Sequence, residues 1–227
     1  MIPGLSVVVP TLSAAATLPA TLAALGGAPA EIVVVDGGST DGTPALAHDL
    51  GARVVAAPRG RGTQIAAGVA AAAGPWLLLL HADTRLGPGW QDAARAAMRD
   101  PGRAGYFRFA LDDDAPAARR LERAVAWRCR ALALPYGDQG LLIHRDLLTA
   151  AGGIAPLPLM EDVDLIRRLG RARLVLLPAE ARTSAARWQR QGYLRRSARN
   201  LACLSLWFLG VPPRIIARMY AGGAGRR

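Results

Sequence analysis

Short apolar runs recur along the first hundred residues and alternate with stretches of helical periodicity. Continuous runs of Val, Ile and Leu are typical of parallel strands that are buried on both faces, and glycine or proline breaks separate the elements. The pattern therefore predicts βαβ units with a largely parallel sheet. The expected strands are 5–9, 32–35, 54–55 and 76–80, and the expected helices are 14–25, 44–50, 62–73 and 90–98.

The second half of the chain is less regular and predicts a mixed sheet. We expect one domain over residues 1–188, with a single cleft, because no repeat or flexible linker interrupts the sequence. A basic, apolar helical extension is expected over 189–227. The expected strands of this half are 106–111, 141–143 and 174–177, and the expected helices are 117–134 and 161–169.

Polar residues follow three successive apolar runs, at the point where each run ends. They are Thr11, Asp36 and Asp83. In an open parallel sheet the carboxyl ends of the strands border the ligand crevice. We therefore expect these three side chains to converge on one site.

Charge is distributed unevenly along the 227 residues, although the net charge is +11. Residues 1–181 hold 18 arginines and all 17 acids, whereas 182–227 hold ten arginines and no acid. The absence of lysine indicates that part of the arginine content reflects codon bias.

Cys129 and Cys203 have neither the spacing of a metal site nor the density of a disulfide framework. No export signal opens the chain, so we expect a cytoplasmic location.

The segment DGGSTDGT, residues 36–43, carries the strongest chemical signal. The strand-end carboxylate of Asp36 can accept hydrogen bonds from a base or a ribose, and the glycines allow the backbone close to a bulky anion. Asp41 and Thr43 can also cap the helix that follows, so a capped turn without ligand is the alternative. The glycine spacing does not match the dinucleotide fingerprint, which disfavours a nicotinamide cofactor.

Six segments together resemble the family 2 glycosyltransferases of the GT-A fold, in particular a small, single-domain bacterial subgroup. The resemblance extends from about Leu5 to about Trp188. It implies an α/β, Rossmann-like nucleotide-diphospho-sugar transferase fold with a mixed central sheet. The segments are VVVPT (7–11), VVDGGSTDGT (34–43), RGRGTQ (59–64), LHADT (80–84), GDQG (137–140) and EDVDL (161–165).

The donor side of the site follows from this resemblance. A nucleotide-diphosphate sugar is the implied donor. Arg59 has its own rationale, because a guanidinium beside a glycine loop can neutralise phosphate, and the stretch through Gln64 leads into an anion-favouring helix N-terminus. The alternative is that Arg59 and Arg61 are solvated loop charges. The residues implied to bind the donor are Pro10, Thr11, Asp36, Ser39, Asp41, Arg59, Gln64 and Asp83.

The family's metal motif, D-x-D, is replaced here by His81-Ala82-Asp83. Asp83 matches the second acid, and His81 stands in place of the first. The departing nucleoside diphosphate still needs a cation or arginines to stabilise its charge. We expect Mg²⁺ or Mn²⁺ at Asp83 and His81, while His81 could instead be an ordinary strand-end residue.

Glu161 and Asp162 match the family's acidic pair, which implies that Asp162 is the general base of an inverting displacement. Glu161 would orient it or bind the acceptor, whose attacking group is a hydroxyl or carboxyl. Both acids would also suit an ordinary helix N-terminus. Asp138 and Gln139 of the GDQG turn are expected to contact the acceptor.

The tail after Glu180 interleaves arginines with apolar side chains at helical spacing. Its apolar stretch is too short to cross a bilayer, but an amphipathic basic helix can lie on an anionic membrane. We expect peripheral contact with the inner face of the cell membrane and a lipid-linked or hydrophobic acceptor. Alternatively the tail packs on the domain or dimerises, and the oligomeric state stays open. No nucleic-acid partner is expected, because no binding module is present. The stripe is Leu194, Ala198, Leu201, Leu204 and Phe208, flanked by Arg195, Arg196 and Arg199.

Two other functions compete with this hypothesis. A nucleotidyltransferase would carry a basic, glycine-rich loop after its first strand, whereas Pro10-Thr11-Leu12-Ser13 stands there. A non-catalytic nucleotide-sugar-binding protein would not need Asp83 or the Glu161-Asp162 pair. The sequence determines neither the donor nucleotide and sugar nor the acceptor.

Overall fold

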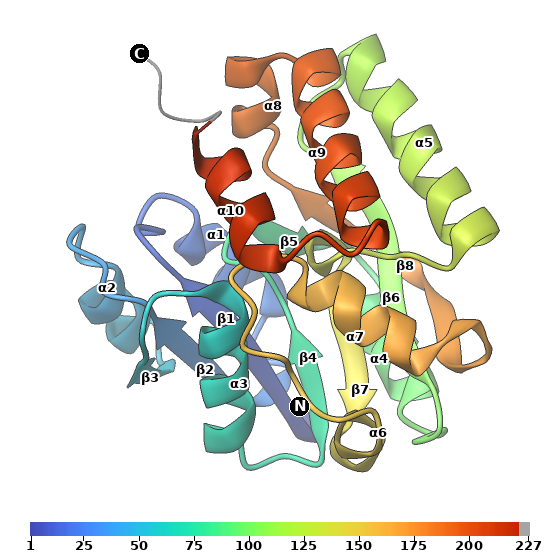
Figure 1. The fold of residues 1–227 in the computed structure, drawn as a ribbon. Helices are drawn as coiled ribbons and strands as arrows, with labels where there is room; N and C mark the ends of the chain where they lie inside the picture. Colours follow the sequence, from blue (N-terminus) through green and yellow to red (C-terminus); the bar gives the residue numbers. More distant parts are fainter. Residues whose placement is uncertain (223–227) are drawn as a thin grey trace.

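The computed structural model describes residues 1–222 as an α/β domain built on one eight-stranded sheet (Figure 1). The strand order is β3-β2-β1-β4-β7-β6-β8-β5. The strands are β1 (Ile2–Thr11), β2 (Pro29–Asp36), β3 (Arg53–Ala56), β4 (Trp76–Leu79), β5 (Thr84–Leu86), β6 (Ala104–Leu111), β7 (Leu141–His144) and β8 (Leu174–Thr183). The helices are α1 (Leu18–Leu25), α2 (Thr43–Asp49), α3 (Arg61–Ala71), α4 (Trp90–Ala97), α5 (Pro116–Leu132), α6 (Arg145–Ala150), α7 (Glu161–Leu169), α8 (Ala186–Gln191), α9 (Tyr193–Phe208) and α10 (Pro213–Gly222), with 3₁₀ turns η1 (Gly137–Gln139) and η2 (Arg171–Arg173).

The parallel half of the sheet follows the predicted βαβ pattern. Strands β1, β2, β3 and β4 are parallel. The apolar runs of β1, β2 and β4 are largely buried because helices cover both faces, whereas β3, at the edge of the sheet, is only half-buried. Helices α1 and α4 pack on one face, and α3, α6 and α7 pack on the other. A side chain at Gly68 of α3 would collide with Val8 and Val35, so this glycine lets α3 approach the sheet closely.

The second half of the sheet is mixed, as the sequence predicts. β7 runs antiparallel to both β4 and β6, whereas β6 and β8 are parallel. β7 therefore joins the parallel half to the remaining strands. Its first residue, Leu141, comes directly after the GDQG turn, so this turn lies at the end of the sheet where β4 ends.

Several predicted boundaries are wrong, and their causes are local. The helix expected from residue 14 begins only at Leu18, because Ser13 adopts a left-handed φ of 51° and a turn fills 14–17. The strand expected to end at residue 177 continues to Thr183, since its second half alternates between buried and exposed residues beside β6. The sequence pattern did not predict β5 or α6, which are only three and six residues long.

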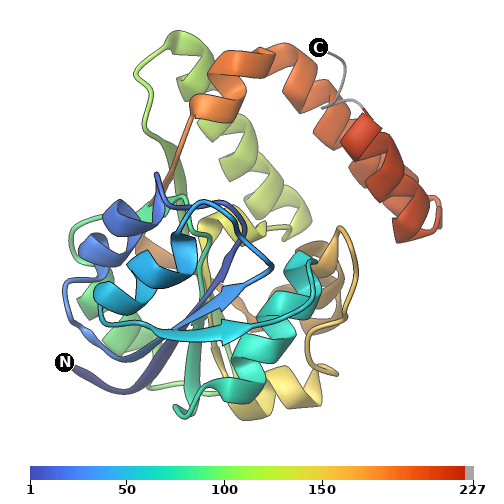
Figure 2. The ribbon, with the colours of Figure 1, turned by 90° about the vertical axis from the view of Figure 1, so that its left-hand side faces the viewer.

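The C-terminal helices form a layer of their own at the end of the sheet where β1 and β4 end. Figures 1 and 2 show α8, α9 and α10 following one another there, with α5 alongside α9. A separate apolar cluster joins β6, α5 and α8 through residues such as Phe109, Val125 and Trp188. The boundary expected at residue 188, between the domain and its C-terminal extension, falls within α8.

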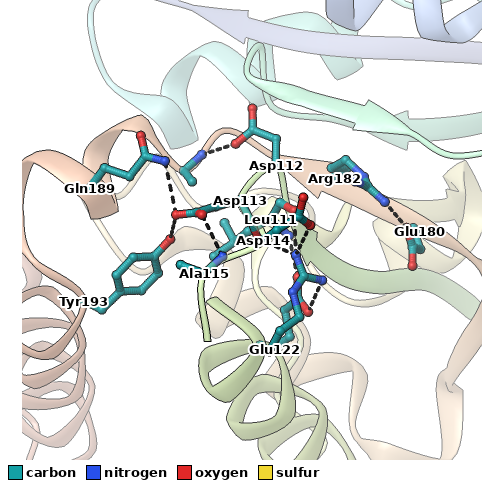
Figure 3. Close-up of polar contacts among 12 residues, drawn as sticks. Leu111, Asp112, Asp113, Asp114, Ala115, Glu122, Glu180, Arg182, Gln189 and Tyr193 are labelled. Carbon is teal, nitrogen blue, oxygen red and sulfur yellow. Dashed lines mark hydrogen bonds and ion pairs between the residues drawn. The ribbon is translucent and has the colours of Figure 1, made fainter. Parts of the chain in front are cut away.

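Carboxylates of the loop after β6 fix these helices in place (Figure 3). Asp112 accepts a hydrogen bond from the backbone N–H of Ala185 at 2.5 Å. Asp113 accepts one from the Tyr193 hydroxyl at 2.6 Å and one from the Gln189 amide at 3.1 Å. Half-buried and exposed polar contacts thus tie α8 and the start of α9 to the main domain.

Candidate active site

A cleft of about 470 Å³ opens at the carboxyl ends of β1 and β4. Six of the predicted donor or metal residues line it: Pro10, Thr11, Arg59, Gln64, His81 and Asp83. Arg187 of α8 also lines it, 3.9 Å from the Asp83 carboxylate. The expected convergence of strand-end polar residues therefore holds for Thr11 and Asp83.

Asp36, Ser39 and Asp41 lie behind this cleft rather than among the residues that line it. Asp36 accepts hydrogen bonds from the backbone N–H groups of Gly38 and Ser39 and from the hydroxyls of Ser39 and Thr11, at 2.5–3.2 Å. Burial raises the pKa of Asp36, but these bonds outweigh burial and hold the pKa below its ordinary value. Its carboxylate is ionised and already engaged by protein donors.

The same turn supports the loop after β1, which forms one wall of the cleft. Ser39 accepts a hydrogen bond from the backbone N–H of Ser13 at 2.8 Å, and Asp41 accepts one from Ala15 at 3.0 Å. The Asp41 carboxylate also binds the hydroxyl of Thr43. The DGGSTDGT turn therefore shapes this cleft through backbone contacts.

Gln64 has a bridging position at the start of α3. Its amide nitrogen donates to the carbonyl oxygens of Thr11 at 2.7 Å and Val35 at 2.8 Å, and its oxygen accepts from the N–H of Gly60 at 3.3 Å. The side chain is buried. It holds the ends of β1 and β2 against the loop that carries Arg59.

A second pocket, of about 150 Å³, adjoins this cleft. The two share Arg61, His81, Asp83, Ser184 and Arg187. The second pocket has an acidic side formed by Asp138 and Asp162, and α9 and α10 close its other side. The residues of α9 and α10 that line it are Arg196, Asn200, Cys203 and Tyr220.

Arg61 links the two acids of EDVDL to the 470 Å³ cleft. Its Nε donates to Oε1 of Glu161, and its guanidinium lies 3.9 Å from Oδ2 of Asp162. Glu161 is almost fully buried, at 2% exposed, and its other oxygen has no hydrogen-bond partner in residues 1–222. Burial raises the pKa of Glu161 more than the Arg61 charge lowers it. In the sequence, Arg61 stood out only as a neighbour of Arg59. No local pattern predicted its ion pair with Glu161, which lies 100 residues further along the chain.

Asp162 is held in place by backbone donors. The N–H of Gly137 donates to Oδ2 at 2.8 Å, and the N–H of Val163 donates to Oδ1 at 2.8 Å. Burial raises the pKa of Asp162, but Arg61 and these hydrogen bonds bring it below the ordinary value. Asp162 therefore presents an ionised carboxylate to the second pocket at neutral pH.

The two predicted acceptor residues have different surroundings. Asp138 lines the second pocket, where burial and the charge of Asp162 raise its pKa to about 6 in spite of Arg128. Gln139 is buried, donates to the carbonyl of Phe107 at 3.0 Å and accepts from the N–H of Tyr136 at 3.2 Å. This burial argues against the direct acceptor contact expected of Gln139, whose side chain instead fixes the GDQG turn.

His81 and Asp83 meet the chemical requirements of a partial cation site. Burial lowers the pKa of His81 to about 4, with Arg61 acting in the same direction, so the imidazole is neutral and can donate a lone pair. Within residues 1–222 no group of three or more His, Cys, Asp or Glu side chains could hold a metal ion by itself. Phosphate oxygens in the adjoining cleft would have to supply further ligands, which is common for Mg²⁺.

Arg187, Asn200 and Tyr220 are further candidate site residues that the sequence did not single out, and Arg196 was expected only to flank the apolar stripe of the tail. All four come from the basic tail after Glu180, whose pattern predicted an amphipathic helix but no site residue. No helix within residues 1–222 is both long and apolar enough to cross a membrane.

The mixed sheet, with a cleft at the ends of its parallel strands and a second pocket beside it, has the GT-A fold of glycosyltransferases. The chain belongs to glycosyl transferase family 2, whose sequence profile matches residues 6–154. This match confirms the predicted family and the prediction of a glycosyltransferase. No curated protein matches the sequence significantly.

Solved structures of glycosyltransferases share the fold at low sequence identity. Glucosyl-3-phosphoglycerate synthase from Mycobacterium tuberculosis, in complex with Mn²⁺, uridine diphosphate and glucosyl-3-phosphoglycerate, is 22% identical with a TM-score of 0.57, over 79% of this chain and 70% of that one. The same enzyme with Mn²⁺, UDP-glucose and phosphoglyceric acid gives 22% and 0.58 over the same shares. S. aureus TarS 1–349 is 16% identical with a TM-score of 0.60, over 80% of this chain and 60% of that one.

Proposed function

We propose that this glycosyltransferase moves a sugar from a nucleotide-diphosphate sugar to a hydroxyl or carboxyl group of an acceptor, with inversion at the anomeric carbon. One observation carries the proposal: the ionised carboxylate of Asp162 faces a pocket that adjoins a cleft suited to a diphosphate. The two spaces share Arg61, His81 and Asp83, so the sugar would lie between them. A base on the acceptor side and a leaving group on the donor side are the arrangement that a single displacement requires.

The donor is assigned to the larger cleft. Pro10 and Thr11 form its wall at the end of β1, and Arg59 lies at its edge beside the N-terminus of α3. Backbone N–H groups at a helix start and a guanidinium both favour phosphate. Asp36, Ser39 and Asp41 would act from behind by holding the loop that receives the nucleoside.

A divalent cation, Mg²⁺ or Mn²⁺, is assigned to Asp83 and His81. Complexes of the M. tuberculosis enzyme contain Mn²⁺ with uridine diphosphate or UDP-glucose, which supports the same requirement here. When bound, the cation would neutralise charge on the leaving diphosphate. Arg187, 3.9 Å from Asp83, would place a second positive charge at the same point.

Asp162 would accept the proton of the attacking acceptor group. Its two backbone hydrogen bonds fix the carboxylate, and Arg61 keeps it ionised. Glu161 orients Arg61 and does not itself line the second pocket. Asp138 remains the candidate to bind the acceptor, since it lies beside Asp162 with one oxygen that has no partner in the described part of the chain.

Two measurements test this proposal. A thermal-shift panel of UDP, GDP and dTDP sugars with Mn²⁺ or Mg²⁺ should show stabilisation by one nucleotide, and no response to any of them would refute nucleotide-sugar binding. With the donor so identified, Asp162→Asn should lower turnover about 100-fold or more while nucleotide affinity stays within two-fold. Asp164→Asn is the matched control, because Asp164 is on the same helix but pairs with Arg168 outside the pocket.

We also propose that α9 contacts an anionic membrane surface and that the acceptor is lipid-linked or otherwise hydrophobic. Leu204 of the predicted stripe packs into the domain core, but Leu194 and Leu201 are 88% and 63% exposed beside Arg195. Exposed leucines next to arginines suit an anionic interface. The chain should sediment with phosphatidylglycerol vesicles and not with phosphatidylcholine vesicles.

A variant pair makes the membrane experiment specific. Leu194→Ser/Leu201→Ser should abolish sedimentation, whereas Leu176→Ser, which changes an exposed leucine of β8, should retain it. Equal binding by both variants, or no binding by the parent chain, would argue against this surface.

A further inference from the structure

Within residues 1–222, Arg196 of α9 is a buried cation without an acidic partner. Its side chain is 9% exposed, its guanidinium lies 5.0 Å from the Trp188 ring, and its Nε has no hydrogen-bond partner in residues 1–222. Its other nitrogens reach only neutral atoms: Oε1 of Gln191 at 3.1 Å and the hydroxyl of Tyr220 at 3.4 Å. Burial of a guanidinium without a carboxylate is unfavourable unless another anion compensates it.

Neighbouring groups increase this excess of positive charge. Arg199 donates to the same Gln191 oxygen at 2.6 Å, and its Nε also lacks a partner in the described part of the chain. Residues 182–227 contain no acidic side chain. Burial lowers the pKa of Arg196, and the charges of Arg187 and Arg199 act in the same direction. The layer formed by α8, α9 and α10 thus lacks a carboxylate side chain of its own for these arginines.

The unpaired charge faces the second pocket and not the donor cleft. Arg196, Asn200 and Tyr220 line the 150 Å³ pocket, but none of them lines the 470 Å³ cleft. The diphosphate of a donor in that cleft would therefore not satisfy Arg196. Asp138 and Asp162 form the acidic part of the same pocket, so the pocket is basic where α9 and α10 close it and acidic where the attacking group would be deprotonated.

We propose that the acceptor is an anion, a hydroxy compound whose phosphate or carboxylate binds Arg196 while its hydroxyl faces Asp162. The inference rests on the proposed function, which makes this pocket the acceptor site. A guanidinium fork suits both oxyanions, and Arg187, Asn200 and Tyr220 supply further donors around it. A cavity of about 150 Å³ holds a molecule about the size of benzene, so the pocket takes a small anionic acceptor or the anionic reacting end of the lipid-linked acceptor proposed above.

Calorimetric titration of the full chain, saturated with UDP and Mn²⁺, tests the proposal with three probes of equal carbon length. Glycerol is neutral, glycerate carries a carboxylate, and glycerol 3-phosphate carries a phosphate. One or both anionic probes should bind at least ten-fold more tightly than glycerol, and the tighter of the two identifies the anion. Equal affinity for all three probes would overturn the proposal.

Two arginine variants show whether Arg196 is responsible. Arg196→Gln should remove most of the preference for the anionic probe, whereas Arg190→Gln, on the exposed face of α8 and outside both pockets, should keep it. An equal loss in both variants would mean a general charge effect and refute the assignment. If Arg196→Gln fails to fold, Arg196→Lys replaces it, because lysine keeps the charge. The affinities of the parent chain for the three probes also test the proposal without any variant.

The same titrations separate this inference from the proposed function. Binding of UDP without any preference for anionic probes would refute the anionic acceptor and leave the donor assignment intact. Failure to bind UDP or any other nucleotide would refute the proposed function, whereas the comparison of Arg196→Gln with Arg190→Gln would still show whether the pocket binds anions.

Discussion

Replacement of Arg61 by methionine should destabilise the domain because it leaves the Glu161 carboxylate buried without its counter-charge. Methionine keeps much of the apolar stem but removes the charge and every donor. Breaking a buried ion pair by removing one partner costs about 3–5 kcal/mol. The Arg61 side chain is 36% exposed, so solvent screens part of the interaction, and about 2–3 kcal/mol is the expected loss.

The loss should be visible as a lower melting temperature. A change of 1 kcal/mol shifts the midpoint by roughly 2–4 °C in a chain of this length, which gives a decrease of roughly 4–12 °C at pH 7.5. Circular dichroism melts of the parent chain and Arg61→Met measure it. Adding Glu161→Gln to Arg61→Met should recover part of the loss, because the double variant no longer buries a charge.

The pH dependence gives an independent check. Burial raises the folded-state pKa of Glu161 above its unfolded value of 4.5, and loss of Arg61 raises it further. A carboxyl with a raised folded pKa costs no stability below its unfolded pKa, costs progressively more as pH rises from the unfolded to the folded pKa, and costs a constant amount above that. The gap between variant and parent should therefore be small at pH 4 and reach its full size near neutrality. A constant gap across this range, or a double variant no more stable than Arg61→Met, would refute this account of Glu161.

Three further substitutions test how the site is supported. Gly137→Ala would bring a methyl within 2.6 Å of Nε2 of His81 and 3.4 Å of Oδ2 of Asp162, so turnover should fall at least ten-fold, as steady-state kinetics would show. Gly62→Ala would meet the backbone oxygen of Ala155 at 2.6 Å and should cost about 1–3 kcal/mol in urea unfolding, and an unchanged midpoint would contradict this close contact. Gln64→Glu replaces a donor to two strand-end carbonyls by an acceptor and should cost about 3 kcal/mol or more, and an unchanged unfolding midpoint would contradict its bridging role.

The core architecture could be predicted from the sequence because it depends on local patterns. The apolar runs that became β1, β2 and β4 are buried on both faces, and such runs need a covered, parallel sheet. The motifs from VVVPT to GDQG identified the family, and the profile match over 6–154 confirms it. Thr11 and Asp83 lie on the cleft because the ends of neighbouring parallel strands must meet at one edge.

Other features depended on which surfaces meet, and periodicity does not encode that. The apolar stripe of α9 is continuous in sequence, yet Leu204 is buried and Leu194 is not, since α9 contacts the domain along only part of its length. Gln139 was expected to contact the acceptor, but the packing of η1 against β6 buries its side chain, and its amide donates to the carbonyl of Phe107 instead.

The residues of the site also divide into those that the sequence determined and those that only the tertiary structure decided. The sequence by itself determined the family, the strands that form the cleft and the presence of an acidic pair at residues 161–162. Only the tertiary structure decided that Arg61 neutralises this pair and that Arg196 closes the second pocket without an acid beside it. Charges interact through space, so their partners are fixed by how α3, α7 and α9 pack together and not by their spacing along the chain.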